Sequence, residues 1–231
     1  MNLKENLKIV NDKIEEIVKK QNRSREDITL IAVSKTISED IVNEAIALGI
    51  KDLGENKAQE IERKMPLLEG DYDMHMIGSL QTNKVRHLID KVKMIHSLDR
   101  ISLAKEINKR AARIDRVMDV LIQVNISGEE TKSGFAADEV LGFLKEIEDY
   151  ENIRIKGLMT MAPHAENPED IRYVFRDLKK LFEDLKKEDI KNVDMQYLSM
   201  GMTNDYHIAL EEGSNMIRVG TAIFGERDYS K

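Results

Sequence analysis

Cysteine is absent from the 231-residue chain. The protein can therefore form no disulfide bond, thiolate metal site or iron–sulfur cluster, and it has no cysteine nucleophile. Long apolar runs are also absent, because no stretch approaches the roughly 18 apolar residues that a bilayer span requires. The N-terminus, MNLKENLKIV, lacks the apolar block and cleavage site of a signal peptide. We therefore expect a soluble cytoplasmic protein with no membrane partner.

Positive charge is in deficit, with 36 Lys and Arg against 43 Asp and Glu and a formal net charge of −7. Because nucleic-acid binding needs a surplus of basic residues on one face, this balance argues against a nucleic-acid partner. The phosphate-binding motifs GxxxxGK[ST] and GxGxxG do not occur, and no HxxxH pair is present among the five histidines. Nucleotide binding and a zinc site are therefore not expected.

Strand and helix patterns alternate along the chain. An apolar stripe from Leu3 to Ile17 predicts a helix at the N-terminus. The apolar run at residues 28–33 is typical of a strand buried on both sides. Further strands are expected at residues 52–54, 74–78, 92–96, 117–124, 153–161, 195–200 and 217–224, and each strand but the last is followed by an expected helix.

Eight strands that alternate with helices predict a parallel sheet with right-handed crossovers. Eight such units close into a (β/α)₈ barrel, which usually has about 250 residues. We therefore predict an α/β protein, a single TIM-type barrel domain over residues 1–231, with an open doubly wound sheet as the alternative. Few residues follow the last expected strand, so we expect no final helix and expect the N-terminal helix to cover that gap.

The first strand ends in Ser34-Lys35-Thr36. Active sites of these barrels lie at the C-terminal ends of the strands. A desolvated lysine there becomes a nucleophilic amine that can form a Schiff base with a carbonyl compound. Alternatively, its ammonium extends into solvent past the strand end. Position alone leaves both interpretations open.

Glycine-containing turns follow the last two strands, at residues 198–203 and 217–221. The loops after strands seven and eight commonly form a phosphate site in barrels. Backbone N–H groups and the hydroxyls of Ser199 and Thr221 could hold a dianion there, whereas the alternative is a pair of helix-capping turns. Arg218 and Gly220 share one side of their strand by alternation. An arginine directed into the barrel mouth needs an acceptor, which a ligand or a structural ion pair could supply.

Seven segments of the chain form a recognisable set: IAVSKT at 31–36, GEN at 54–56, HMIGSLQTNK at 75–84, KSGF at 132–135, GLMTM at 157–161, LSMGM at 198–202 and RVGTAIFG at 218–225. Together they resemble the pyridoxal phosphate homeostasis protein family from about residue 28 to residue 227. The combination is specific, although each segment alone would not be.

The resemblance implies the barrel of fold-type III pyridoxal 5′-phosphate (PLP) proteins, like the N-terminal domain of alanine racemases, with PLP as cofactor. Its implied cofactor-binding residues are Lys35, Asn56, Ser199, Gly201, Arg218, Gly220 and Thr221. By this resemblance Lys35 holds PLP as a Schiff base, Arg218 faces the pyridine nitrogen and Asn56 lies near the ring hydroxyl. The other four residues of the set hold the phosphate.

Arginine can only donate hydrogen bonds, so a pyridine nitrogen facing Arg218 stays unprotonated and is a weaker electron sink. By resemblance, racemases of this fold also need a tyrosine, and decarboxylases a cysteine, from a second domain. This chain ends soon after the eighth strand and has no cysteine. We therefore expect a monomeric, non-catalytic PLP carrier or buffer in intracellular PLP homeostasis, with apo PLP-dependent enzymes as recipients. The alternatives are a small PLP-dependent amino-acid racemase or related enzyme, and a class I aldolase.

Overall fold

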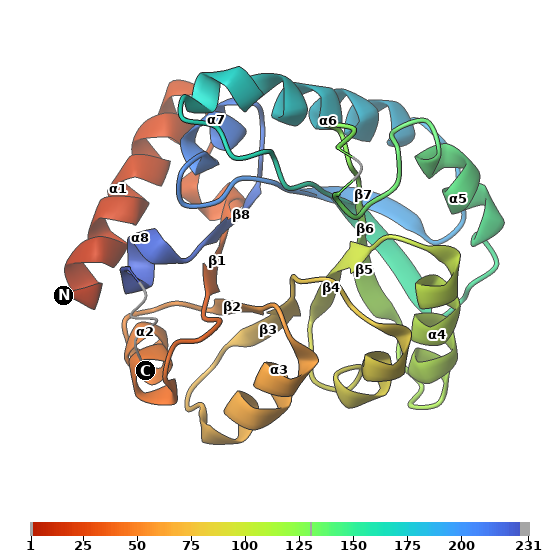
Figure 1. Ribbon diagram of the computed structural model, residues 1–231, viewed down its shortest axis with the longest axis horizontal. Helices are drawn as coiled ribbons and strands as arrows, with labels where there is room; N and C mark the ends of the chain where they lie inside the picture. The colour runs from red at the N-terminus through yellow and green to blue at the C-terminus, as the bar shows by residue number, and fades with distance from the viewer. Residues whose placement is uncertain (1, 130, 227–231) are drawn as a thin grey trace.

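The strands of the protein close into a barrel. In the computed structural model, which describes residues 2–129 and 131–226, eight parallel strands follow one another around the barrel in sequence order (Figure 1). The strands are β1 Thr29–Val33, β2 Asp52–Glu55, β3 Asp73–Met76, β4 Met94–Leu98, β5 Met118–Gln123, β6 Ile153–Met159, β7 Val193–Ser199 and β8 Met216–Val219. Because β1 pairs with β8, the sheet has no open edge. The predicted (β/α)₈ barrel is confirmed, and the open-sheet alternative is wrong.

Helices surround the barrel (Figure 1). The α-helices are α1 Leu3–Lys20, α2 Glu39–Ala47, α3 Ala58–Lys64, α4 Ile101–Ala112, α5 Val140–Glu146, α6 Arg172–Leu185, α7 Tyr206–Glu211 and α8 Thr221–Phe224. Short 3₁₀ helices are η1 Arg25–Asp27, η2 Met65–Leu67, η3 Thr82–His87 and η4 Pro168–Ile171. Among the described residues, no helix is both long enough and apolar enough to cross a membrane.

The connection between β3 and β4 contains the 3₁₀ helix η3 where the sequence pattern predicts an α-helix. Val85 and Leu88 are both fully buried and stand three residues apart. This spacing fits the three residues per turn of a 3₁₀ helix. The segment therefore buries its apolar side chains without the full helix that was expected.

The C-terminal segment corrects two expectations. Strand β8 ends at Val219 rather than at residue 224, and a final helix exists, because Thr221–Phe224 form the single turn α8. The backbone N–H groups of Ile223 and Phe224 both donate to the carbonyl of Gly220 at 2.9 Å. The apolar residues that read as a continued strand are instead buried as a helical turn.

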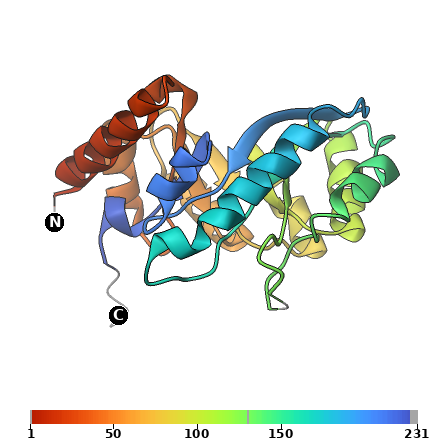
Figure 2. The same ribbon diagram turned by 90° about the horizontal axis from the view of Figure 1, so that it is seen from above.

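Helix α1 covers the place where the chain returns to its start. Its buried stripe is the predicted one, with Leu3, Leu7, Val10, Ile14 and Ile17. Both views show α1 beside α8 (Figures 1 and 2), and the Asn6 side chain donates a hydrogen bond of 2.9 Å to the carbonyl of Ile223. The expectation that the N-terminal helix covers this gap is confirmed.

The barrel interior has an apolar layer and a polar one. Side chains alternate along each strand, so Leu30 and Ala32 pack among the helices while Ile31 faces inward. The inward apolar layer consists of Ile31, Met94, Leu121, Met159 and Met216, with Tyr197 packed against it. The same alternation directs Val33 and Arg218, which stand two residues beyond Ile31 and Met216, into the mouth at the C-terminal strand ends.

Candidate functional site

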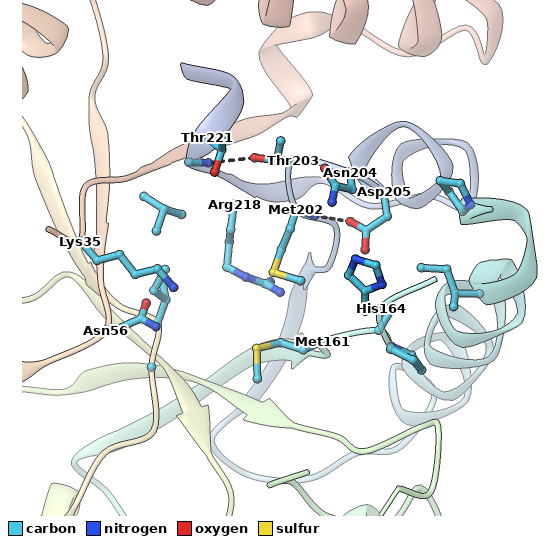
Figure 3. A pocket seen from close by; sticks show the side chains of 18 of the residues that line it. Lys35, Asn56, Met161, His164, Met202, Thr203, Asn204, Asp205, Arg218 and Thr221 are labelled. Carbon is cyan, nitrogen blue, oxygen red and sulfur yellow. Dashed lines mark hydrogen bonds between the residues drawn. The ribbon is translucent and has the colours of Figure 1, made fainter. Parts of the chain in front are cut away.

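A cavity of about 540 Å³ opens at the C-terminal ends of the strands. Five of the seven residues that the sequence assigns to the site line it: Lys35, Asn56, Arg218, Gly220 and Thr221. In Figure 3 Arg218 lies near the centre, with Lys35 and Asn56 on one side and His164 and Asp205 on the other. Barrel closure therefore gathers residues from both ends of the chain into one cavity.

Lys35 stands two residues beyond the end of β1 at Val33, and its side chain extends into the cavity, next to Asn56 (Figure 3). By alternation it continues the inward row of Ile31 and Val33. The next residue, Thr36, has a φ of +65°, which is a strained conformation for a β-branched side chain. The Thr36 hydroxyl donates to the carbonyl of Lys35 at 2.6 Å. The chain therefore turns away directly after Lys35 and leaves its amine in the cavity.

Arg218 is only 4% exposed. One terminal nitrogen donates to the hydroxyl oxygen of Ser199 at 2.5 Å, and the other donates to the carbonyl of Thr160 at 2.8 Å. Burial lowers the pKa of Arg218 to about 10, although the nearby Asp205 opposes this shift. The guanidinium is therefore a cation at neutral pH, and it has N–H donors beyond these two bonds.

The turns after β7 and β8 meet at Thr203. Its hydroxyl oxygen accepts from the backbone N–H of Gly220 at 3.3 Å and from that of Ala222 at 3.4 Å. Both oxygen lone pairs then have donors, so the hydroxyl proton can be donated to a ligand in the cavity. Thr203 lines the cavity, but sequence reasoning omitted it from the site. The sequence signal that could have identified Thr203 was its position two residues after Gly201, in the same turn.

Ser199 and Gly201 do not line the cavity, contrary to their expected role as phosphate ligands. Ser199 is fully buried below Arg218, and its hydroxyl also lies 3.0 Å from Nδ1 of His96. Gly201 has a φ of +96°, and an added Cβ would stand 2.7 Å from the Cβ of Ala209. Glycine is therefore required there because α7 packs closely against the turn. The depth of a residue below a barrel mouth does not follow from a motif.

A buried ion pair lies below the segment that carries Lys35. The fully buried Lys64 donates to the carbonyl of Ser34 at 2.6 Å and to Oε1 of Glu55 at 2.7 Å, and the Ser34 hydroxyl donates to the same Oε1 at 2.7 Å. Burial, followed by a hydrogen bond with Glu60, raises the pKa of Glu55 to about 7, although Lys64 and Ser34 oppose this rise. These contacts link the ends of β1 and β2 to α3. The sequence analysis did not single out Lys64.

The donors of this cavity suit an anionic carbonyl compound such as PLP. Lys35 offers an amine, Arg218 a charged donor, and the Thr203 turn a hydroxyl. Lys35 and Thr203 lie at different edges of the cavity and Arg218 lies near its centre (Figure 3), which suits a ligand with an aldehyde, a phosphate and a ring nitrogen. Within residues 2–129 and 131–226, no cluster of three or more His, Asp or Glu side chains could hold a metal ion.

Comparison with known proteins agrees with this geometry. The family model described as "Alanine racemase, N-terminal domain" matches residues 6–228. The pyridoxal phosphate homeostasis protein of Aquifex aeolicus is 43% identical over 99% of this chain and 100% of its own length. That of Haemophilus influenzae is 38% identical over 100% of this chain and 98% of its own length.

The chain belongs to the pyridoxal phosphate homeostasis protein family. A solved structure of PipY from Synechococcus elongatus with PLP bound is 29% identical, with a TM-score of 0.81. The alignment covers 92% of this chain and 100% of PipY. This similarity agrees with the barrel fold of the chain.

The Glu55 pair predicts a pH dependence of stability. The pKa of Glu55 rises from 4.5 to about 7 on folding, so folded protein binds the proton more tightly than the unfolded chain does. This proton contributes its full stabilisation below pH 4.5, the pKa of Glu55 in the unfolded chain, and the stabilisation is lost as pH rises through about 7. From about pH 5 to about pH 8, the free energy of unfolding of wild type should fall by about 2–3 kcal/mol more than that of Glu55→Gln.

Urea unfolding at the two pH values measures this difference. Glu44→Gln is the matched control, because Glu44 is an exposed residue of α2. The control should keep the pH dependence of wild type. An equal fall in wild type and Glu55→Gln would contradict the prediction.

Proposed function

We propose that the protein binds PLP, holds it as a Schiff base on Lys35 and acts as a carrier or buffer in intracellular PLP homeostasis, without turnover. The observation that carries the proposal is the shared cavity of Lys35, Arg218 and the Thr203 turn. The PLP-bound structure of the related PipY supports it, as do the names of the curated relatives. In this proposal the protein acts in the cytoplasm as a monomer, and apo PLP-dependent enzymes receive the cofactor.

Each part of PLP has a partner in the cavity. PLP supplies, when bound, an aldehyde that condenses reversibly with a primary amine, and Lys35 offers that amine. The Thr203 hydroxyl and the turn at Gly220 and Thr221 hold the phosphate through neutral donors. Arg218 would donate toward the pyridine nitrogen, and Asn56 would lie near the ring hydroxyl. Ser199 and Gly201 contribute by supporting these groups.

Charge at Arg218 argues for a carrier rather than an enzyme. With a pKa of about 10, this guanidinium keeps its proton at neutral pH and can only donate. A pyridine nitrogen beside it therefore stays unprotonated, which weakens PLP as an electron sink. Carbon-acid chemistry such as racemisation depends on that sink.

One observation favours the racemase alternative. His164 and Asp205 line the side of the cavity that faces Lys35 across Arg218 (Figure 3), where a second acid or base would stand. Burial raises the pKa of Asp205.

A hydrogen-exchange experiment distinguishes the two functions. If the protein is a carrier, PLP-loaded protein in D₂O should exchange the Cα hydrogen of alanine no faster than free PLP does, as NMR can measure. Faster exchange that His164→Ala abolishes would establish the alternative.

Reduction with borohydride tests the covalent bond. Wild-type protein mixed with PLP should show a visible absorption band, which borohydride removes while fixing PLP on the peptide that contains Lys35. Lys35→Ala should lose both the band and the label. Lys57→Ala is the matched control, because Lys57 is an exposed lysine one residue beyond Asn56, and it should keep both. A label that persists in Lys35→Ala would overturn the proposal.

Phosphate recognition by Thr203 gives a separate prediction. Thr203→Val keeps the shape of the side chain but removes the hydroxyl, so PLP should bind about tenfold more weakly, as expected for one lost hydrogen bond. Binding of pyridoxal, which has no phosphate, should stay unchanged, and Thr203→Ser should restore PLP binding. Absorbance titration measures both ligands. Equal weakening of PLP and pyridoxal would show that Thr203 does not contact the phosphate.

A further inference from the structure

A row of hydrogen-bonded polar side chains crosses the barrel interior from its base to the cavity. Oδ1 of Asp52, at the start of β2, lies 3.0 Å from Nε2 of His75, and Nδ1 of His75 lies 3.0 Å from Nε2 of His96. Nδ1 of His96 lies 3.0 Å from the Ser199 hydroxyl, which Arg218 contacts. We call these five residues the polar chain. His75, His96, Ser199 and Arg218 are each at most 4% exposed.

One consistent assignment of donors runs along the polar chain. Arg218 can only donate, so it donates to the Ser199 oxygen, which leaves the Ser199 proton available to Nδ1 of His96. Burial, and then the neighbouring His75 and Arg218, hold the pKa of His96 well below its usual value, so this ring is neutral. A neutral ring that accepts at Nδ1 carries its proton on Nε2.

The direction continues to the base of the barrel. Nε2–H of His96 donates to Nδ1 of His75, and Nε2–H of His75 then donates to Asp52. Burial alone would raise the pKa of Asp52, but His75 and Lys93 more than offset it and lower the pKa. Lys93 stands 3.7 Å from the same carboxylate oxygen. Asp52 is therefore an ionised acceptor, and all bonds of the polar chain point from Arg218 toward it.

We propose that His96 is a positioning residue that acts through Ser199 to hold the Arg218 guanidinium in the orientation that meets the ring nitrogen of PLP. This inference rests on the proposed function. His75 and Asp52 select the His96 tautomer with the proton on Nε2. In the opposite tautomer, Nδ1–H of His96 would point at the Ser199 oxygen, and His96 could not accept the Ser199 proton.

The electrostatics of Arg218 explain why such an arrangement is needed. Among the described residues, no carboxylate forms an ion pair with Arg218. The charge of the nearby Asp205 only partly offsets the cost of burying this cation. The polar chain gives the cation an oriented row of dipoles that ends on a carboxylate. Because its direct acceptors are a hydroxyl and the Thr160 carbonyl, the guanidinium keeps its remaining donors for a ligand.

Variants separate positioning from packing. His96→Gln keeps one acceptor and one donor on a neutral side chain, whereas His96→Leu keeps only an apolar side chain. Ser199→Ala removes the link between His96 and Arg218. Ser97→Ala is its matched control, because Ser97 is the next residue of β4 and is fully buried, and its hydroxyl forms no hydrogen bond with the described residues.

Nitrogen NMR of histidine-labelled apo-protein tests the polar chain without PLP. The two ring signals are assigned by their loss in His75→Gln and His96→Gln. The His96 ring should be neutral with its proton on Nε2, and the His75 ring should carry a proton on Nε2. Ser199→Ala should shift the His96 Nδ1 signal, and Ser97→Ala should leave it unchanged. A proton on Nδ1 of His96 in the wild type, or equal spectra for the two serine variants, would overturn the inference.

Absorbance titration with PLP completes the test. His96→Leu and Ser199→Ala should bind PLP about tenfold more weakly than wild type, whereas His96→Gln and Ser97→Ala should stay within about twofold. Equal losses in His96→Gln and His96→Leu would overturn the positioning role. Failure of wild type itself to bind PLP would instead overturn the proposed function, and the tautomers of the apo-protein would distinguish these two failures.

Discussion

Parallel pairing between the first and the last strand is the constraint on which the site depends. Thr29 stands opposite Met216 and Ile31 stands opposite Arg218 in this pairing. Because side chains alternate along both strands, one register decides that Lys35 and Arg218 enter the same interior. A shift of one residue would turn one of them toward the helices. The amine and the cation therefore share a cavity because of the backbone hydrogen bonds between these two strands.

Two buried cations near the mouth are compensated in different ways. Lys64 donates directly to Glu55, and this pair keeps the ends of two strands together. Arg218 meets only a hydroxyl and a carbonyl directly, and the nearby Asp205 favours its charge without forming an ion pair with it. Lys64 uses its donors for contacts within the fold, whereas Arg218 keeps donors for an anionic or electron-rich ligand. A buried cation thus stabilises the fold at one position and is available for binding at the other.

The fold and much of the site could be predicted from sequence because they depend on local patterns. Alternating strand and helix patterns specify the barrel, and strand-end positions identify Lys35, Arg218, Gly220 and Thr221. The depth of Ser199 and the packing role of Gly201 depend on how α7 and Arg218 fill the mouth, which no local pattern encodes. Lys64 reads as a surface residue of a helix, since a buried ion pair needs a partner that only the tertiary fold supplies. The turn α8 resembled a strand because its apolar residues are equally suited to packing under α1.

The docking of α1 against α7 and α8 also bears on how the protein reaches its fold during synthesis. The first strand has a partner on one side as soon as β2 exists, but its other side waits for β8, almost the whole chain later. Contacts of such long sequence separation form slowly because the intervening chain must be ordered first. Until residues up to about Phe224 have left the ribosome, the apolar stripe of α1 and one edge of β1 stay uncovered. The nascent chain is therefore most exposed to aggregation just before its N-terminal helix finds its place.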